Sequence, residues 1–207
     1  YIFADQLPPI QDDLLFVEKY KTTRKLPNDK TVEFRPLFPS DEFEYRNFFY
    51  SLQEKTIYSR FFYRVKLFPH EVVQKHWAGI DYRKNVSIIG QVQKGGGKEI
   101  IAIGTYAKGE DDRADVGFVV REDFQNMGIS SYLLAILEGI AKENDYKGFS
   151  ASVLSDNKAM QRVFKKRYPH LKELTGSRNE ILLLMDFDDA VVDPASDDQC
   201  KWQKLVP

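Results

Sequence analysis

The segment from residue 114 to residue 140 constrains the fold more than any other part of the chain. An apolar stretch typical of a strand, at 114–120, runs into a short loop that contains Gly128. The period of the apolar residues then changes, because the next ones fall three or four places apart, on one face of a helix. They are Ile129, Tyr132, Leu133, Ile136, Leu137 and Ile140. A buried strand that leads into an amphipathic helix predicts a central sheet with this helix packed against it.

Further strand and helix signals surround this unit. Strands are expected at 31–37, 86–92, 100–106, 148–153 and 181–187, and helices at about 41–52, 69–77 and 157–167. The run Lys94-Gly95-Gly96-Gly97-Lys98 is interpreted as a hairpin loop, because it lacks the spacing of a phosphate-binding P-loop. The order predicts an α+β or mixed α/β fold with the sheet at its centre.

The two ends of the chain differ from its middle. Residues 1–30 hold three prolines and no sustained period, so we interpret them as an N-terminal arm or linker. Residues 188–207 are interpreted as an acidic C-terminal tail, which leaves 31–187 as the folded domain. The first residue is Tyr1 rather than Met, which is consistent with a piece of a longer polypeptide.

The overall composition narrows the classes of partner. Lys and Arg number 30 and Asp and Glu 31, and a net charge of −1 argues against a nucleic-acid partner. No apolar run is long enough to cross a bilayer, so no membrane contact is expected. Cys200 is the single cysteine, which fits a reducing, cytoplasmic compartment. His70 and His76 are six residues apart and do not share a helical face, so no metal site is expected.

The loop and the first helical turn after the central strand have the composition of an anion-binding site. A helix N-terminus presents unpaired N–H groups and the positive end of the helix dipole. Gly128 has no Cβ, so a bulky anion can approach the backbone, and Ser130 and Ser131 keep the first turn small. These features predict a cradle for a phosphate or pyrophosphate group. From spacing alone, an ordinary strand–loop–helix connection with one glycine fits equally well.

This segment resembles motif A of the GNAT superfamily of acyl-CoA-dependent N-acyltransferases. In that motif a Gln or Arg is followed by Gly at the third place and by Gly or Ala at the fifth. Gln125, Gly128 and Ser130 stand at these places, and the serine departs from the pattern but is still small. Asn157 stands where the family often has an Asn beside the pantetheine arm. The resemblance covers about 31–187.

Residues upstream narrow the resemblance to one subgroup. The runs Val32-Glu33-Phe34-Arg35-Pro36 and Ile57-Tyr58-Ser59-Arg60-Phe61-Phe62 look like bacterial GNAT domains linked to acyl-CoA metabolism. That subgroup includes protein-lysine acetyltransferases and GNAT domains fused to CoA-handling enzymes.

The resemblance implies a fold, a co-substrate and a reaction. The implied fold is a mixed, mostly antiparallel sheet flanked by helices and splayed at the cofactor strand. The implied reaction is the direct transfer of an acetyl group from acetyl-CoA to an amine, with a protein lysine as the expected acceptor, without a metal. The implied cofactor-binding residues are Phe118, Val119, Val120, Gln125, Asn126, Met127, Gly128, Ile129, Ser130, Ser131 and Asn157.

Two residues are expected to handle protons. Asp115 begins the cofactor strand, at a place where the resembling lysine acetyltransferases usually carry a Glu that acts as the base. Because Asp is shorter, we expect relay through water, and a solvated carboxylate at the start of a strand is the alternative interpretation. Many GNAT enzymes have a Tyr acid seven residues after the Asn, where this chain has Phe164. Tyr168, one helical turn later, is the candidate substitute.

The resemblance also implies an acceptor pocket and leaves two functions open. Tyr58, Arg60 and Tyr63 are acceptor-site candidates, and the basic helix at 158–167 lies near the cofactor in this fold. The first function is that of an acetyl-CoA-dependent N-acetyltransferase. The second is that of a non-catalytic acyl-CoA-binding regulatory domain of a larger CoA-handling enzyme, which Phe164 favours. A small-molecule amine also remains open as the acceptor.

Overall fold

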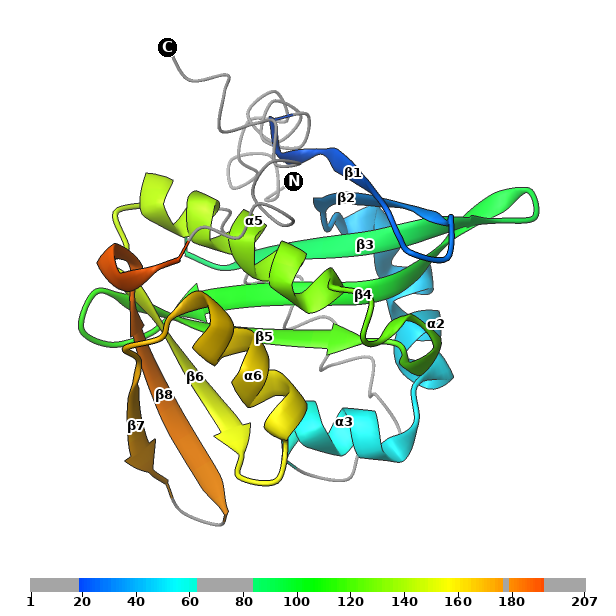
Figure 1. Cartoon of the computed structure of the whole chain (residues 1–207). Coiled ribbons are helices and arrows are strands. Elements are labelled where there is room, and N and C mark those ends of the chain that lie inside the picture. Colours follow the sequence, from blue (N-terminus) through cyan, green and yellow to red (C-terminus); the bar gives the residue numbers. More distant parts are fainter. Residues whose placement is uncertain (1–18, 63–83, 177–178, 192–207) are drawn as a thin grey trace, which may run out of the picture.

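The computed structural model describes residues 19–62, 84–176 and 179–191. Within these ranges the chain forms eight strands and four longer helices (Figure 1). The strands are β1 (Thr22–Lys25), β2 (Thr31–Pro36), β3 (Val86–Lys94), β4 (Gly97–Lys108), β5 (Arg113–Val120), β6 (Gly148–Leu154), β7 (Lys172–Thr175) and β8 (Glu180–Asp186). The helices are α2 (Glu42–Ser51), α3 (Glu54–Phe61), α5 (Ile129–Glu143) and α6 (Lys158–Arg167), with short 3-10 turns η1 (Pro39–Asp41), η2 (Glu122–Phe124) and η3 (Phe187–Asp189).

All the strands belong to one mixed sheet in the order β1-β2-β3-β4-β5-β6-β8-β7. The pair β5–β6 is parallel and every other neighbouring pair is antiparallel. The expected α/β fold with a mostly antiparallel sheet is therefore confirmed. The glycine-rich loop is confirmed as a hairpin, because Lys94 at the end of β3 pairs with Gly97 at the start of β4.

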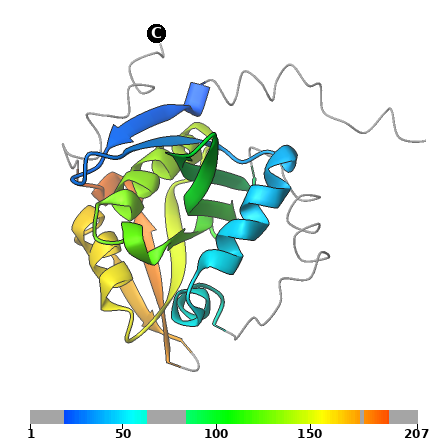
Figure 2. The same ribbon diagram turned by 90° about the vertical axis from the view of Figure 1, so that its right-hand side faces the viewer.

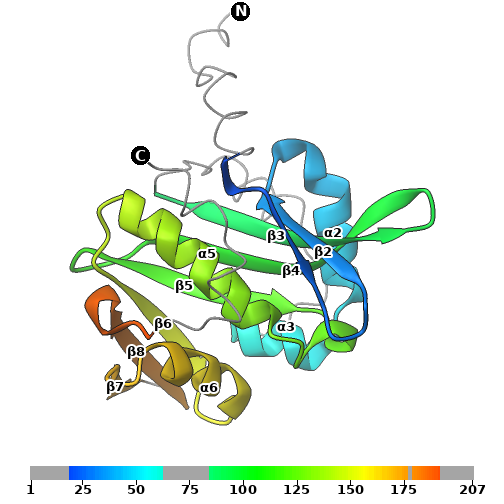
Figure 3. The same cartoon turned by 45° about the horizontal axis from the view of Figure 1, so that its top comes forward.

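Helices cover both faces of the sheet (Figure 2). On one face α5 lies lengthwise over β3, β4 and β5 (Figure 3), and α6 lies beside it. On the other face α2 and α3 pack against β4 and β5. The side chains of β5 alternate between these two layers: Phe118 belongs to the core under α5, whereas Val119 belongs to the core under α2 and α3.

The parallel pair β5–β6 is the feature that creates a site. Its register joins only Arg113, Ala114 and Asp115 to Gly148, Phe149 and Ser150. Both strands continue past these pairs, β5 to Val120 and β6 to Leu154, without pairing to each other. The sheet is therefore split beyond Asp115, and the side of β5 that faces β6 keeps its backbone groups free of a partner strand.

Two short strands were not expected from the sequence. β1 lies within the segment interpreted as an arm, so the sheet begins before residue 31, and β7 precedes the last expected strand. Both have four residues, and every residue of β7 is exposed, so neither carries a clear alternation of apolar side chains. The expected helix at 69–77, Tyr63 and most of the acidic tail lie outside the described residues.

β1 is attached to α5 as well as to the sheet. The Thr22 and Tyr132 hydroxyls are 2.8 Å apart, and the Tyr20 hydroxyl donates to the Glu143 carboxylate at the end of α5. The Arg24 guanidinium lies 5.0 Å from the centroid of the Tyr132 ring. β1 and the residues just before it therefore lie along α5.

Candidate active site

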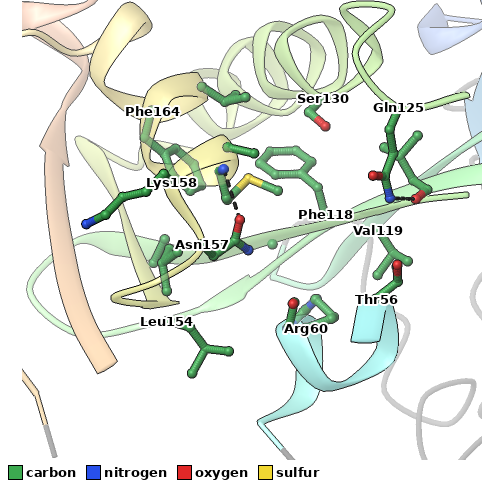
Figure 4. A pocket seen from close by; sticks show the side chains of 18 of the residues that line it. Thr56, Arg60, Phe118, Val119, Gln125, Ser130, Leu154, Asn157, Lys158 and Phe164 are labelled. Atoms are coloured by element: carbon green, nitrogen blue, oxygen red, sulfur yellow. Dashed lines mark hydrogen bonds between the residues drawn. The ribbon is translucent and has the colours of Figure 1, made fainter. Parts of the chain in front are cut away.

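A pocket of about 680 Å³ opens where β5 and β6 separate (Figure 4). One end of the pocket is formed by the loop after β5 and the first turn of α5. Its other walls are α3, the free side of β5, the end of β6 and the start of α6. This volume lies within the range of small-molecule and cofactor sites in proteins.

The loop at the end of β5 is shaped by two left-handed residues and one hydrogen bond. Asn126 has a φ of 61° and Gly128 a φ of 78°, a conformation in which a residue with a Cβ is strained. The Gln125 Nε2 donates to the Val120 carbonyl oxygen over 2.9 Å, which ties the loop to the strand that it leaves. The backbone conformation of the loop and its bond to β5 therefore hold it in this shape.

The first turn of α5 is prepared for an anion. The first intrahelical bond runs from the Tyr132 N–H to the Gly128 carbonyl oxygen, at 3.1 Å, so the N–H groups of residues 129–131 have no intrahelical acceptor. No acidic residue occupies this turn. Gly128, Ser130 and Ser131 line the pocket here. The expected phosphate cradle therefore has the right donors at the positive end of the helix dipole.

Asn157 stands at the opposite wall, at the start of α6. Its Oδ1 accepts from the Met160 N–H at 3.2 Å, which caps the helix. Its Nδ2 group has no hydrogen-bond acceptor among the described residues. Asn157 and the free side of β5 thus line the same pocket.

Asp115 on β5 and Arg60 on α3 both line the pocket, where the Asp115 side chain is exposed and the Arg60 side chain is half-buried. Burial raises the pKa of the Asp115 carboxyl, and the Arg60 guanidinium partly opposes that rise. Burial lowers the pKa of Arg60, opposed by Asp115 and by Tyr45. Arg60 comes from the last turn of α3, and its Nη2 donates to the Thr105 Oγ1 over 3.2 Å.

Tyr168 does not lie at the pocket. Its side chain is fully buried between α5 and α6, and its hydroxyl donates to the Glu138 Oε2 over 2.7 Å. Burial, with the neighbouring Glu138, raises the pKa of Tyr168 well above its usual value. Arg167 also donates to Glu138, over 2.8 Å. Tyr168 therefore belongs to a buried polar cluster that joins two helices, and the structure does not bring it together with Asp115.

The position at which the family often has its Tyr acid is part of the pocket wall. Phe164 lines the pocket, and its ring centroid lies 5.9 Å from that of Phe118. Of the basic residues on α6, Lys158 lines the pocket, whereas Arg167 and Lys165 pair with Glu138 and Glu173. Lys158 is therefore the only basic residue of α6 that lines the pocket.

Two features of the site were missed in the sequence. The Arg24 Nη1 donates to the Gly128 carbonyl oxygen over 3.3 Å, so β1 reaches the cradle. The Gln53 N–H donates to the Glu122 Oε1 over 3.0 Å, which links the start of α3 to η2. The close contact of Arg60 with β5 was missed as well. Gly117 could have indicated it, because a glycine inside a strand often marks the close approach of another group.

The described part of the chain holds no cluster of three His, Cys, Asp or Glu side chains that could bind a metal ion. It also holds no helix with the length and hydropathy needed to cross a membrane.

Comparisons with known proteins place the chain among acetyltransferases. The sequence profile of the Acetyltransferase (GNAT) family matches residues 48–168, which is more than half of the chain. An acetyltransferase of Pseudomonas aeruginosa is 23% identical over 146 residues, 70% of this chain and 78% of the relative.

Two solved structures are similar in fold. The GNAT domain of the S. lividans PAT superposes with a TM-score of 0.70 at 23% identity, over 81% of this chain and 97% of that chain. Mycobacterium smegmatis RimJ in complex with CoA-disulfide superposes with a TM-score of 0.63 at 13% identity, over 84% and 90% of the two chains.

Proposed function

The chain belongs to the Acetyltransferase (GNAT) family, whose reaction is acyl-CoA-dependent acetyl transfer, and on this premise we propose that its acceptor is a protein lysine and that Asp115 is the base. The expected GNAT fold and acyltransferase class are confirmed by the family match and by the similar structures. The roles of single residues are proposals.

One observation carries this function. A single pocket joins the N-terminus of α5 to Asp115 along the side of β5 that has no partner strand. The donors fit an acyl-CoA molecule: unpaired N–H groups and Gly128 suit the pyrophosphate. The free backbone of β5 and the Asn157 amide suit the pantetheine arm, whose own amides need hydrogen-bond partners. An acyl-CoA molecule held in this way supplies an acetyl group activated as a thioester.

Asp115 is suited to remove a proton from the incoming amine. Its side chain faces the pocket, and burial raises the pKa of its carboxyl, which makes the carboxylate a stronger base. A lysine ammonium ion gives one proton to Asp115, directly or through a water molecule. The neutral nitrogen then bonds to the acetyl carbon as the carbon–sulfur bond breaks, and the nitrogen gives its second proton to water.

The leaving sulfur takes up a proton from solvent in this proposal. Phe164 cannot donate one, and the Tyr168 hydroxyl is held by Glu138 away from the pocket. A thiol with a pKa of about 8.5 is a fair leaving group without an enzymatic acid. The reaction therefore needs one titrating side chain at the centre.

A protein lysine fits the geometry of the pocket as an acceptor. Asp115 lines the pocket with an exposed side chain, and a lysine amine stands at the end of a flexible four-carbon stem that can reach it. The similarity of 32–36 and 57–62 to the lysine acetyltransferase subgroup supports the same acceptor.

The test is the transfer of isotope-labelled acetyl groups from acetyl-CoA to proteins of a bacterial lysate, with Gly128→Trp as the control. Label on a discrete protein, located on a lysine by mass spectrometry and absent with the control, is the expected result. Label on small amines alone would change the acceptor and keep the reaction.

The alternative function is a domain that binds acyl-CoA without turnover. Phe164 is the observation that favours it, because this pocket lacks the usual family acid at that place. Tight binding of acetyl-CoA by calorimetry, with no transfer to any protein or amine, would support this alternative over the enzyme.

A further inference from the structure

Arg60 lies directly on the backbone of β5. A Cβ placed on Gly117 would be 2.7 Å from the Arg60 Cζ and 2.8 Å from its Nη2. Atoms do not approach this closely, so the guanidinium fills the space that any other residue at 117 would need. Gly117 does not have a positive φ, so the glycine is not required by its backbone conformation. The contact with Arg60 is the feature that requires a glycine here.

The guanidinium has few partners for its five donor hydrogens. It donates to the Thr105 Oγ1 over 3.2 Å, and Thr105 pairs with Gly117 across β4 and β5. It also lies 5.4 Å from the centroid of the Phe61 ring. Among the described residues no carboxylate lies within ion-pair distance of it. Arg60 lines the pocket, and Figure 4 shows it extending from α3 toward β5.

A cation held in this way is costly unless an opposite charge faces it. The facing charge is Asp115, two residues before Gly117 on the same strand and therefore on the same face of the sheet. An apolar side chain would fill the space above Gly117 without this cost. The arrangement is therefore better explained by a task at the reaction centre than by packing.

We propose that Arg60 is a positioning residue for the reaction, a fixed positive charge that keeps Asp115 ionised as the base and favours an uncharged amine over an ammonium ion beside it. This inference rests on the proposed function. A neighbouring cation destabilises the ammonium ion, which favours loss of its proton. It also stabilises the carboxylate, which weakens the base but keeps Asp115 in the ionised form that can accept a proton.

The other charged groups around this pair are few. Tyr45 on α2 is the additional titratable group that acts on Arg60, and Arg60 is the only charge that acts on Asp115 among the described residues. The remaining charged residues of the pocket wall are Lys55 on α3, Glu122 on η2, and Asp156 and Lys158 at the start of α6. β6 faces Asp115 with Ser150, which is neutral.

The test compares Arg60→Gln and Arg60→Lys with the unaltered chain in two measurements. The first is the pH dependence of kcat/KM with acetyl-CoA and a lysine peptide. The second is the titration of the Asp115 carboxyl by carbon NMR, with Asp115→Asn to assign its signal. In Arg60→Gln both midpoints are expected to rise by about one pH unit, since an opposite charge nearby lowers a carboxyl pKa by about 1–3 units. Arg60→Lys restores the charge and is expected to return both midpoints toward the unaltered value.

Gly117→Ala is an independent way to remove the charge from its place. The new methyl group competes with the end of a flexible side chain rather than with backbone, so we expect Arg60 to move and the fold to persist. This variant should behave like Arg60→Gln although it keeps the arginine. Arg46→Gln, which removes a half-buried guanidinium on α2 that does not line the pocket, is the matched control and should leave both midpoints unchanged.

The outcomes separate this inference from the proposed function. A carboxyl titration that is the same in Arg60→Gln and in the unaltered chain overturns the role of Arg60, whatever the activity is. An unaltered chain that transfers no acetyl group overturns the proposed function, and that result does not depend on any Arg60 variant. Thermal unfolding of each variant confirms that it is folded before the titrations are compared.

Discussion

The two ends of β5 hold the two halves of the site, and they are built in different ways. After Val120 the site consists of backbone N–H groups in one short loop and one helical turn. Around Asp115 and Gly117 it consists of side chains, the Asp115 carboxylate and the Arg60 guanidinium. Arg60 comes from α3, far earlier in the chain. The first half needs only a local conformation, whereas the second exists only once α3 has packed on the sheet. The two halves should therefore respond to different substitutions.

The largest effect is expected from Gly128→Trp, at the backbone-built end. The residue would carry a bulky side chain at a φ of 78°, at the point where the phosphates are expected. Binding of acetyl-CoA should weaken by about a thousandfold or more, or about 4 kcal/mol. Calorimetry measures the affinity, and Gly96→Trp in the exposed hairpin, where a Cβ meets no atom within 4 Å, is the matched control. An unchanged affinity in Gly128→Trp would refute the cradle.

Asp115→Asn should damage the other end with a smaller effect. The amide keeps the shape of the carboxyl but cannot accept the proton, so kcat should fall by about a hundredfold, within the usual range for a general base. The Kd for acetyl-CoA should not change, because the backbone-built end is intact. Steady-state kinetics and calorimetry on the same preparation separate these effects. Full turnover across the pH range would mean that Asp115 is only a solvated carboxylate.

This contrast between the two ends of β5 also explains which parts of the fold and of the site could be predicted from the sequence. The strand, loop and helix around Gly128 were predictable because their signals are contiguous: an apolar strand, a glycine and a 3.6-residue period. The split between β5 and β6 was expected from the family resemblance, since periodicity does not report which strands pair. Arg60 could be named as a candidate, but its contact with Gly117 depends on packing between distant segments. β7 escaped prediction because a short, wholly exposed strand has no apolar alternation.

Tyr168→Phe tests whether a third region, between α5 and α6, is separate from both ends of β5. The lost hydroxyl donates to the buried Glu138 carboxylate, and a hydrogen bond to a charged group contributes about 2 kcal/mol. The free energy of unfolding in urea should fall by about that amount, while kcat and the Kd for acetyl-CoA stay the same. Tyr50→Phe, at an exposed position of α2, should leave stability unchanged. A clear loss of kcat in folded Tyr168→Phe would make Tyr168 the missing acid.

The smallest effect is expected where β1 reaches the backbone-built end. The Arg24 guanidinium lies beside the first turn of α5, at the positive end of the helix dipole, where no acidic residue balances it. The guanidinium and the N-terminus of α5 are both positive and repel each other, and a bound anion relieves this repulsion. Arg24→Gln should therefore weaken acetyl-CoA binding by about threefold, since charges at helix ends contribute about 0.3–1 kcal/mol.

The salt dependence of binding and a Lys25→Gln control distinguish the loss of the Arg24 charge from a loss of structure. The difference between Arg24→Gln and the unaltered chain should shrink as the salt concentration rises, because exposed charges are screened within about 10 Å at 0.1 M. Lys25→Gln removes a charge from the next residue of β1, which pairs with Asp29 instead of the cradle, and should bind acetyl-CoA normally. If Arg24→Gln and Lys25→Gln lose the same affinity, β1 affects binding only through the overall positive charge of this surface. The side chains that bind the phosphates then belong only to the loop after β5 and to α5.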